Sequence, residues 1–309
     1  MTLEAPLVVL VGPTAVGKTA VSLSLARRLK AEIISADSRL VYQGMDIGTA
    51  KPTPRQRAQV PHHMIDVAPP NQTYSLAAYR RAALAAIDDI HRRGRLPILV
   101  GGTGQYVMAV VEGWQPPPKA EDRRLRRQLE AVADEQGAQA LHARLAAVDP
   151  DRARAIDPRN VRRVIRALEI YQVTGQPASR QRVKKPPPYA ILQLGLTLPR
   201  AELYRRIEER IEGMLAAGWL DEVGSLLEAG LAPNAPPMSA IGYRQLVDHL
   251  QGELSLDAAR WDISRRSRQF IRRQSNWFKP DDPNIRWFTN QPGVVDQMLA
   301  VIEDWLADG

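Results

Sequence analysis

The segment LVVLVGPTAVGKT, which begins at Leu7, constrains the fold of this chain more than any other stretch. A continuous apolar run leads into Gly12, and the spacing from there through Gly17 to Lys18 and Thr19 matches G-x-x-x-x-G-K-[ST]. The run is typical of a strand buried on both faces of a parallel sheet, and the residues after the loop continue with helical spacing. In this setting backbone N–H groups close around phosphate oxygens, the lysine neutralises phosphate and the threonine hydroxyl can hold Mg²⁺. We therefore expect a phosphate-binding loop between a strand and a helix.

The segments that follow alternate between strand and helix. EIISAD and LPILV are apolar runs that predict two further strands, at residues 32–37 and 96–100. Between them, YSLAAYRRAALAAIDDIHRRG has helical spacing, with Ser75 as its N-cap and Gly94 as its terminator. Residues 51–71 are rich in proline and predict an irregular stretch. The whole pattern predicts an α/β fold in which a doubly wound parallel sheet carries helices on its faces.

Two proline-rich segments divide the chain. QPPPK at residues 115–119 and KKPPPY at residues 184–189 enclose a stretch in which only helical periodicity is found. A strand-like segment, YAILQLGLTL, resumes at the end of the second one. We therefore expect an α/β core of residues 1–116 and 188–309 with an all-helical insertion domain at residues 117–187.

Composition and charge limit the class of protein. A chain of 309 residues, 44% of them hydrophobic, can bury a sizeable core, and the absence of cysteine excludes disulfides, thiolate zinc sites and cysteine nucleophiles. No apolar stretch approaches the ~20 residues of a membrane helix, and the first residues lack the pattern of a signal peptide. We expect a cytoplasmic monomer without membrane contact. The formal net charge of +8, concentrated in arginine-rich segments, favours a polyanionic partner.

The ends of the predicted strands carry the candidate reactive groups. Asp37 follows one strand, and Thr103 follows another after Gly101 and Gly102. In an open α/β sheet a ligand binds beyond the carboxyl ends of the strands, where both residues and the phosphate loop converge. An ATPase or GTPase would offer an acidic residue where this chain has glycines and a threonine, so we expect the loop to hold a diphosphate that departs whole. Asp37 is then a metal partner, a general base or a turn aspartate.

Three arginine clusters are candidates for binding a nucleic-acid backbone. They are Arg123, Arg124, Arg126 and Arg127; then Arg159, Arg162 and Arg166; and finally Arg265, Arg268 and Arg272, the last followed by Trp277 and Phe278. The second cluster lies opposite an apolar helical face that includes Val164 and Ile165. His62 and His63 predict a surface or turn pair and not a metal site, because no third ligand lies at a useful spacing. The apolar ladder from Leu203 to Leu215 predicts a buried helix face.

In combination these segments resemble one family, the tRNA dimethylallyltransferases, also called tRNA isopentenyltransferases, and the likeness extends over nearly the whole chain. The motifs appear in family order. They are GPTAVGKT at 12–19, ISADSRLVYQGMDIGTAKP at 34–52, YSLAAYRRAA from 74, PILVGGTGQY at 97–106, RALEIYQVTG at 166–175, IGYRQL at 241–246 and SRQFIRRQSNWF at 267–278. The chain ends soon after the last motif, without the zinc-finger extension of eukaryotic relatives, and so resembles the bacterial type.

The resemblance implies a tRNA-modifying transferase with Mg²⁺ as its cofactor. In the family, the dimethylallyl group of dimethylallyl diphosphate moves to N6 of the adenine immediately 3′ of the anticodon, and diphosphate is released. Carried over, the diphosphate contacts are Gly12, Pro13, Thr14, Ala15, Val16, Gly17, Lys18 and Thr19, with Thr19 also at the metal. Asp37 is implied as the general base, Thr103 as the donor to the leaving diphosphate, and Lys18 as a further catalytic residue. The implied contacts to the tRNA anticodon stem-loop are Asp37, Ser38, Arg39, Leu40, Thr103, Arg126, Arg162, Arg163, Val164, Ile165, Arg166, Arg244, Arg268 and Arg272.

Two residues depart from the family pattern. Leu40 stands where many relatives have Gln, which removes a polar contact to the target base, and Val16 replaces a frequent Ser, which removes a hydroxyl but leaves the backbone cradle. Three other functions remain as alternatives: a nucleotide or small-molecule kinase that uses ATP on the same loop, an RNA-binding protein without catalysis, and a prenyltransferase of free adenine nucleotides. The missing acidic residue after the third strand argues against the kinase, and the arginine clusters argue against a free nucleotide as acceptor.

Overall fold

The computed structural model describes residues 5–115, 123–181 and 183–308. The chain divides into two compact units, one of Met1–Val111 and Pro187–Gly309 and the other of Glu112–Pro186, and each has its own core. The smaller unit begins at Glu112, before the expected boundary at residue 117, and most of QPPPK lies outside the described residues. No helix among the described residues is long and apolar enough to cross a membrane.

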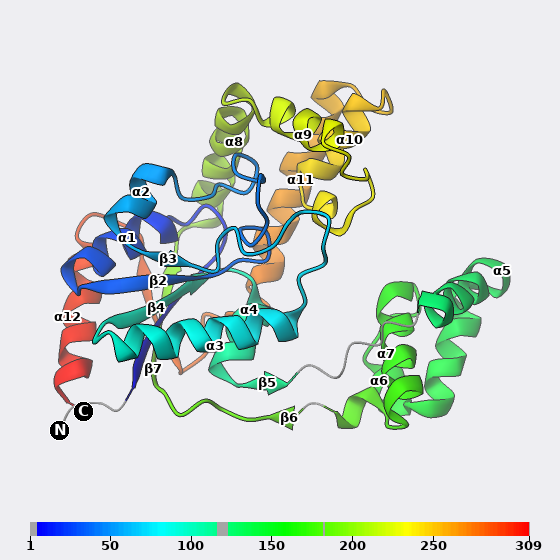
Figure 1. The fold of residues 1–309 in the computed structure, drawn as a ribbon, viewed down its shortest axis with the longest axis horizontal. Coiled ribbons are helices and arrows are strands. Elements are labelled where there is room, and N and C mark those ends of the chain that lie inside the picture. The colour runs from blue at the N-terminus through cyan, green and yellow to red at the C-terminus, as the bar shows by residue number, and fades with distance from the viewer. Residues whose placement is uncertain (1–4, 116–122, 182, 309) are drawn as a thin grey trace. The chain divides into compact units, whose positions relative to one another are not determined.

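Six parallel strands form the sheet of the larger unit, in the order β3-β2-β4-β1-β7-β8 (Figure 1). Leu7 to Val11 of β1 have no exposed surface, and every residue of β2 is buried. Burial on both faces explains why these strands are continuous apolar runs in the sequence. The strands are β1 (Pro6–Val11), β2 (Ala31–Ala36), β3 (His62–His63), β4 (Leu96–Gly101), β7 (Ala190–Thr197) and β8 (Ile285–Thr289).

Three strands of this sheet end at the same level. In the ladder Gly101 of β4 pairs with both Val11 of β1 and Ala36 of β2. A Cβ atom at Gly101 would lie 2.2 Å from the carbonyl oxygen of Ala36, so the close approach of these two strand ends requires glycine. The next residues along each strand, among them Asp37, therefore leave the sheet side by side, at the edge where open α/β sheets bind ligands.

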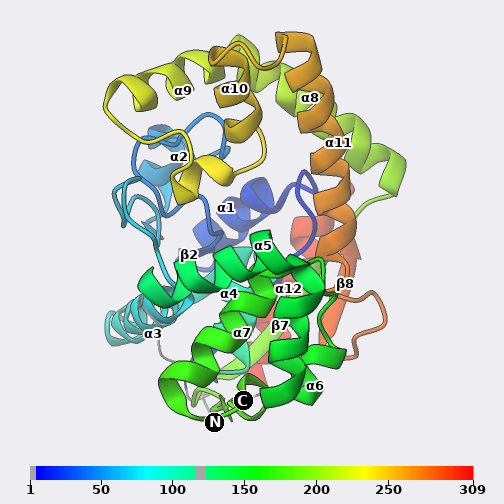
Figure 2. The same ribbon diagram turned by 90° about the vertical axis from the view of Figure 1, so that its right-hand side faces the viewer.

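Helices cover both faces of the sheet. The connections from β1 to β2 and from β2 to β4 run in opposite directions across it, so right-handed crossovers place α1 and α3 on opposite faces. Helix α12 packs beside α1, and α4 packs beside α3 (Figure 1). Helices α8, α9, α10 and α11 pack together as a group, which Figure 2 shows from a second side. The bounds are α1 (Lys18–Arg28), α2 (Pro54–Gln59), α3 (Leu76–Arg92), α4 (Gly104–Val111), α8 (Arg200–Ala216), α9 (Trp219–Glu228), the 3-10 turn η2 (Pro236–Ser239), α10 (Tyr243–Leu250), α11 (Leu256–Gln274) and α12 (Val294–Ala307).

The smaller unit is mainly helical. Its core joins Leu141 and Leu145 of one helix to Val164 and Ile165 of another, all of them buried. Gly137, with φ of 86°, kinks the first helix. A short antiparallel ladder of two strands accompanies the helices and was not predicted from the sequence. The elements are β5 (Trp114–Gln115), α5 (Arg123–Val148), α6 (Pro150–Arg154), α7 (Val161–Thr174), η1 (Ala178–Arg180) and β6 (Val183–Lys184).

The expected α/β fold with a parallel sheet is confirmed, and three local predictions need comment. The helix expected after Ser75 is present, and the Ser75 hydroxyl accepts the N–H of Ala78. The stretch 51–71, expected to be irregular, contains α2 and β3. His62 and His63 were predicted to be a surface or turn pair; they form no turn but the edge strand that pairs with β2, where both are partly exposed. Elements this short leave no periodicity for sequence reasoning to detect.

Candidate active site

A cavity of ≈ 450 Å³ lies at the edge of the larger unit's sheet where the strands end. Its walls come from the phosphate loop, from the segments that follow β2 and β4, and from helix α8. Among the residues that line it are Thr14, Ala15, Gly17, Lys18, Thr19, Asp37, Leu40, Thr49, Ala50, Gly102, Arg206 and Arg210. The fold thus brings Lys18, Thr19, Asp37 and Leu40, all predicted from the sequence, into one cavity.

Lys18 lies across the loop to which it belongs. Its ammonium donates to the carbonyl oxygens of Gly12 at 2.9 Å and Pro13 at 2.8 Å. Burial lowers the pKa of Lys18 to about 8; the Asp37 carboxylate acts in the opposite direction, and Arg210 lowers the pKa further. The ammonium has therefore lost part of its hydration, and an anion in the cavity would supply the missing counter-charge.

Asp37 and Thr103 are tied together through the backbone after β2. Oδ1 of Asp37 accepts the N–H of Arg39 at 2.8 Å, in a turn that fixes the carboxylate at the end of the strand. Oγ1 of Thr103 accepts the N–H of Ser38 at 3.1 Å, and the N–H of Thr103 donates to the carbonyl of Ala36 at 3.2 Å. Because the Thr103 hydroxyl accepts from Ser38, its hydrogen can still be donated to a third group.

Two arginines of α8 line the cavity and were not identified in the sequence analysis. Arg206 pairs with Glu202 at 2.6 Å. Burial lowers the pKa of Arg210, while the nearby Asp37 carboxylate acts against that shift. The sequence analysis considered only the apolar ladder of this helix, which is indeed buried at Leu203 and the two following turns. Two arginines four residues apart beside that ladder were the signal that could have revealed them.

One carboxylate holds the segment that forms another wall of the cavity. Glu222 of α9 accepts four hydrogen bonds, three from consecutive backbone groups and one from a hydroxyl. The donors are the N–H groups of Asp46, Ile47 and Gly48, at 2.8, 2.7 and 3.3 Å, and the hydroxyl of Tyr243, at 2.6 Å. Thr49 and Ala50, which line the cavity, follow directly in the chain. Sequence reasoning missed Glu222, because its partners lie far away in the chain.

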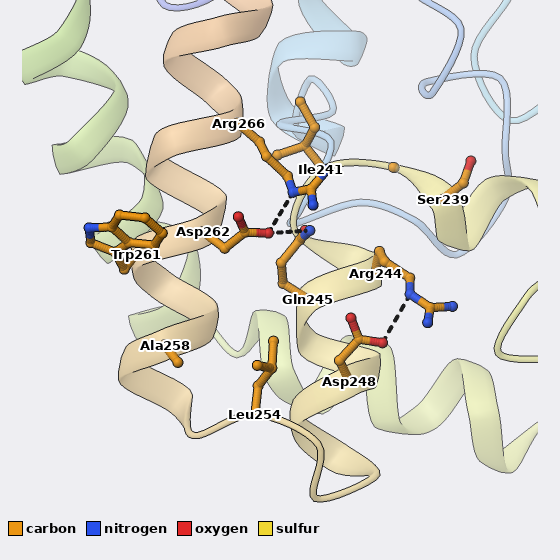
Figure 3. Close-up of a pocket in the computed structure, with 11 residues that line it drawn as sticks. Ser239, Ile241, Arg244, Gln245, Asp248, Leu254, Ala258, Trp261, Asp262 and Arg266 are labelled. Carbon is orange, nitrogen blue, oxygen red and sulfur yellow. Dashed lines mark hydrogen bonds and ion pairs between the residues drawn. The ribbon is translucent and has the colours of Figure 1, made fainter. Parts of the chain in front are cut away.

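Of three expected RNA contacts of the larger unit, one lies at the cavity and two lie outside its lining. Leu40 lines it, while the guanidinium of Arg39 donates to the carbonyl of Pro236 at 3.3 Å. Arg244 lies on α10 and pairs with Asp248 at 2.9 Å, beside a second cavity of ≈ 630 Å³ between α10 and α11 (Figure 3). The second cavity shares none of the phosphate loop with the first, so the structure does not bring Arg244 into the same cavity as Lys18.

The two expected contacts on α11 have different surroundings. Arg268 pairs with Glu208 and lies over the ring of Tyr204, 5.4 Å from its centroid. Arg272 lines a third cavity of ≈ 470 Å³, whose wall also contains the first two residues of the phosphate loop. Both arginines therefore lie on the helix that reaches the phosphate loop.

In the smaller unit the expected RNA contacts separate into exposed arginines and buried apolar side chains. Arg126 pairs with Glu169 at 2.8 Å, and Arg166 approaches the same carboxylate at 3.5 Å. Val164 and Ile165 are 0% and 3% exposed and belong to the core. Their side chains are therefore unavailable to RNA in this arrangement. The arginines of this helix also include Arg162 and Arg163, which are exposed.

Among the residues that the structure describes, no cluster of three or more His, Asp or Glu side chains could hold a metal ion by itself. The main cavity nevertheless contains one carboxylate, from Asp37, and the hydroxyl of Thr19. Mg²⁺ is commonly bound by one or two protein oxygens together with substrate phosphates and water. The residues present fit a metal shared with a diphosphate better than a metal held by the protein alone.

The phosphate loop, the Asp37 carboxylate and two arginines line one cavity at the strand ends, and Thr103 is hydrogen-bonded to the residue after Asp37. These features define a phosphate-loop α/β protein with a basic cavity at the carboxyl edge of its sheet. The IPP transferase family model matches residues 40–281, and the Isopentenyl transferase model matches residues 5–66. The chain belongs to the IPP transferase family, and the resemblance noted in the sequence is confirmed.

Relatives and solved structures agree with this assignment. A tRNA dimethylallyltransferase of Roseiflexus castenholzii is 56% identical over 297 residues, which is 96% of this chain and 97% of the relative. One from Roseiflexus sp. (strain RS-1) is 51% identical and covers 97% and 99% of the two chains. The crystal structure of the tRNA isopentenylpyrophosphate transferase from Bacillus halodurans is similar with a TM-score of 0.73 and 41% identity, over 99% of this chain and 98% of that one. A eukaryotic dimethylallyltransferase acting on tRNA gives a TM-score of 0.83 at 27% identity, over 99% and 80% of the two chains.

Proposed function

We propose that this chain transfers the dimethylallyl group of dimethylallyl diphosphate to N6 of the adenine immediately 3′ of the anticodon in tRNA and releases diphosphate. The observation that carries the proposal is the common edge of the sheet, where Lys18 and Asp37 line one cavity and Thr103 is bonded to the residue after Asp37. Lys18 and Thr103 suit an anionic leaving group, and Asp37 suits a nucleophile that must lose a proton.

The acceptor needs a base. The exocyclic amine of adenine is a weak nucleophile because its lone pair is delocalised into the ring, and a carboxylate that takes its proton during the attack strengthens it. Asp37 lines the cavity, and the turn with Arg39 holds its carboxylate in place. We assign Asp37 as the general base, which accepts the amine proton as the new C–N bond forms.

The donor needs stabilisation of the negative charge that gathers on diphosphate as the allylic C–O bond breaks. Lys18, Arg206 and Arg210 supply positive charge at the cavity wall, and Thr103 is assigned as a hydroxyl donor to the departing oxygen. Groups that are already oriented toward developing charge contribute the largest share of many rate accelerations. The hydroxyl of Thr19 would hold Mg²⁺ together with the diphosphate, and the bound metal would neutralise phosphate charge.

The acceptor RNA must present a base that has left its stack. Extrusion of a nucleotide costs a few kcal/mol, which contacts to the surrounding phosphates offset. Arg39, Arg244, Arg268 and Arg272 of the larger unit and the arginines of α7 in the smaller unit are assigned to the anticodon stem-loop. We propose that the chain acts as a monomer, in the cytoplasm where tRNA is found.

A single experiment tests this function. The purified protein is incubated with Mg²⁺, labelled dimethylallyl diphosphate and an anticodon stem-loop, and the mass of the modified adenosine is measured. We expect transfer by the natural chain, loss of transfer in Asp37→Asn with RNA binding retained, and full transfer in the control Asp296→Asn on α12. AMP should compete poorly with the stem-loop, and ATP should not be consumed. Phosphoryl transfer from ATP without prenylation would refute the proposal.

A further inference from the structure

The last residue of helix α11 reaches into the active-site edge of the sheet. Gln274 is 4% exposed, although it carries a polar amide. Its Oε1 accepts the N–H of Thr14 in the phosphate loop at 2.8 Å, and its Nε2 donates to the carbonyl of Gly102 at 3.0 Å. A single side chain is therefore bonded both to the phosphate loop and to the residue that precedes Thr103.

The glycines on either side of Thr103 make room for this helix end. A Cβ atom at Gly102 would lie 2.3 Å from Nε2 of Gln274, and one at Gly104 would lie 2.1 Å from the ring of Trp277. Neither glycine has a positive φ, so backbone conformation does not require them. Their small size is required by the close approach of the end of α11 and of Trp277, which follows it, so the segment around Thr103 is shaped against this part of the chain.

The contacts of Gln274 bear on the geometry of catalysis. Lys18 belongs to the phosphate loop and Thr103 to the segment after β4, and the two must contact the same diphosphate under the proposed function. A buried amide with both its donor and its acceptor engaged has little freedom to move. A displacement of about 1 Å at a catalytic group costs up to ~100-fold in rate.

We propose that Gln274 is a positioning residue of the transfer reaction: its amide sets the spacing between the phosphate loop and Thr103, and so aims the Thr103 hydroxyl at the leaving oxygen. The proposal rests on the proposed function, because it concerns how the same cavity is held in its working geometry. Gln274 acts through Thr14 and Gly102 and does not itself touch the reacting atoms.

Substitutions at position 274 separate the hydrogen bonds of the amide from its volume. Gln274→Met fills nearly the same space without a donor or an acceptor. We expect kcat to fall by about tenfold to a hundredfold. The affinity for the anticodon stem-loop and the KM for RNA should stay unchanged, because the arginines assigned to RNA are intact. The calorimetric affinity for inorganic diphosphate with Mg²⁺ should fall less than kcat.

Gln245 of α10 is a matched control. It is 3% exposed, its Oε1 accepts the N–H of Gly242 at 2.8 Å, and its Nε2 donates to Asp262 at 3.0 Å (Figure 3). Gln245→Met therefore removes an equally buried amide with the same pair of bonds. We expect it to lower the melting temperature as much as Gln274→Met does and to leave kcat at saturating substrate unchanged.

Gln274→Glu supplies a readout that a purely structural role would not give. A protonated carboxyl group reproduces the donor and the acceptor of the amide, whereas the carboxylate repels the carbonyl oxygen of Gly102. The kcat of this variant, divided by that of the natural chain at the same pH, should therefore rise as the pH is lowered. If Gln274→Met does not fold, the pH dependence of this ratio still tests the proposal.

The outcomes distinguish this proposal from the function on which it rests. Failure of the natural chain to transfer the dimethylallyl group would refute the proposed function itself. An active natural chain together with folded Gln274→Met that keeps full kcat would overturn the positioning role. Equal loss of kcat in Gln274→Met and Gln245→Met, or a flat pH ratio for Gln274→Glu, would reduce Gln274 to a packing residue.

Discussion

The strand-end edge of the larger unit and helix α7 of the smaller unit present functional side chains in different ways. At the sheet edge the register of three strands fixes where Asp37 emerges, and backbone hydrogen bonds hold Thr103 beside it. On α7 the arginines extend from a packed helix, and Arg166 is held by the buried carboxylate of Glu169. Backbone geometry thus sets the position of the proposed reactive groups, whereas side-chain pairing sets that of the proposed RNA contacts. Substitutions at the edge should change the rate, and substitutions on the helix should change affinity.

The largest effect is expected at Lys18. Lys18→Met removes the charge that faces the diphosphate, and we expect kcat/KM for dimethylallyl diphosphate to fall by about a hundredfold to a thousandfold. The same substitution should not lower the stability of the fold at neutral pH and should tend to raise it. The pKa of Lys18 is lowered from 10.5 to about 8 by burial, so the folded chain holds this proton less well than the unfolded chain.

The stability of the natural chain should consequently rise with pH between about 8 and about 10.5, the folded and unfolded pKa values of Lys18. Lys18→Met should lack this rise and melt at neutral pH no lower than the natural chain. Thermal unfolding across that range measures both. A lower melting temperature for Lys18→Met would mean that the hydrogen bonds to Gly12 and Pro13 outweigh the cost of burying the ammonium.

Thr103 should show a smaller loss that falls on kcat. Thr103→Val removes the hydroxyl and leaves the N–H of Ser38 without its acceptor. We expect kcat to fall by about tenfold to a hundredfold while RNA affinity is kept. Thr103→Ser restores the hydroxyl and should recover most of the rate. Steady-state kinetics with the stem-loop check both variants, and similar rates for Val and Ser would show that the hydroxyl takes no part.

Asp37 and Thr103 also illustrate how much of the site could be predicted from the sequence. Asp37 and Thr103 were predictable because each follows an apolar strand, and parallel strands end at one edge. Arg210 could have been found from its spacing with Arg206. Glu222 and Gln274 were not predictable, because their roles depend on contacts between distant segments; Gln274 and Thr14 are 260 residues apart in the chain. A local motif therefore located the proposed reactive groups, and the tertiary fold was needed to find the residues that hold them in place.

Substitution of Glu222 tests whether the support of a cavity wall affects the binding of dimethylallyl diphosphate. Glu222→Ala leaves the N–H groups of Asp46 and Ile47 without their acceptor and loosens the segment that leads to Thr49. We expect the KM for dimethylallyl diphosphate to rise by about fivefold to tenfold with a smaller change in kcat. The substitution Glu228→Ala, at the exposed end of the same helix, is the control. An unchanged KM would show that the wall keeps its shape without this carboxylate.

The helix of the smaller unit should give effects on affinity alone. Arg166→Ala removes one cation next to Glu169, and we expect the Kd for the stem-loop to rise by a few-fold with kcat at saturating RNA unchanged. If the guanidinium contacts a phosphate, the slope of log Kd against log salt should fall by about one. Binding measured at several salt concentrations tests this. A fall in kcat would contradict the division between the two regions.

The smallest effect on function is expected at Glu32, a buried carboxylate that, like Glu169, is bonded to two basic side chains but lies in the sheet. Glu32 of β2 has a side chain that is 3% exposed and accepts hydrogen bonds from Arg93 and from His63 at 2.9 and 2.7 Å. Burial by itself would raise the pKa of Glu32, but the hydrogen bonds from Arg93 and His63 outweigh it and hold the pKa below its ordinary value of 4.5.

A carboxyl group with a lowered pKa in the folded chain stabilises the fold above its ordinary pKa, and this stabilisation is lost as the pH falls through the folded value. The melting temperature of the natural chain should therefore drop as the pH falls below 4.5, and Glu32→Gln should show a shallower drop from a lower starting point at neutral pH. Its transfer rate and RNA affinity should match those of the natural chain at 25 °C. Because Glu32 and Glu169 are equally buried and each is bonded to two basic side chains, Glu169→Gln is the matched variant, and only it should alter the binding of RNA. Equal effects of both substitutions on RNA affinity would mean that the arginines of α7 serve the fold, as Arg93 does beside Glu32.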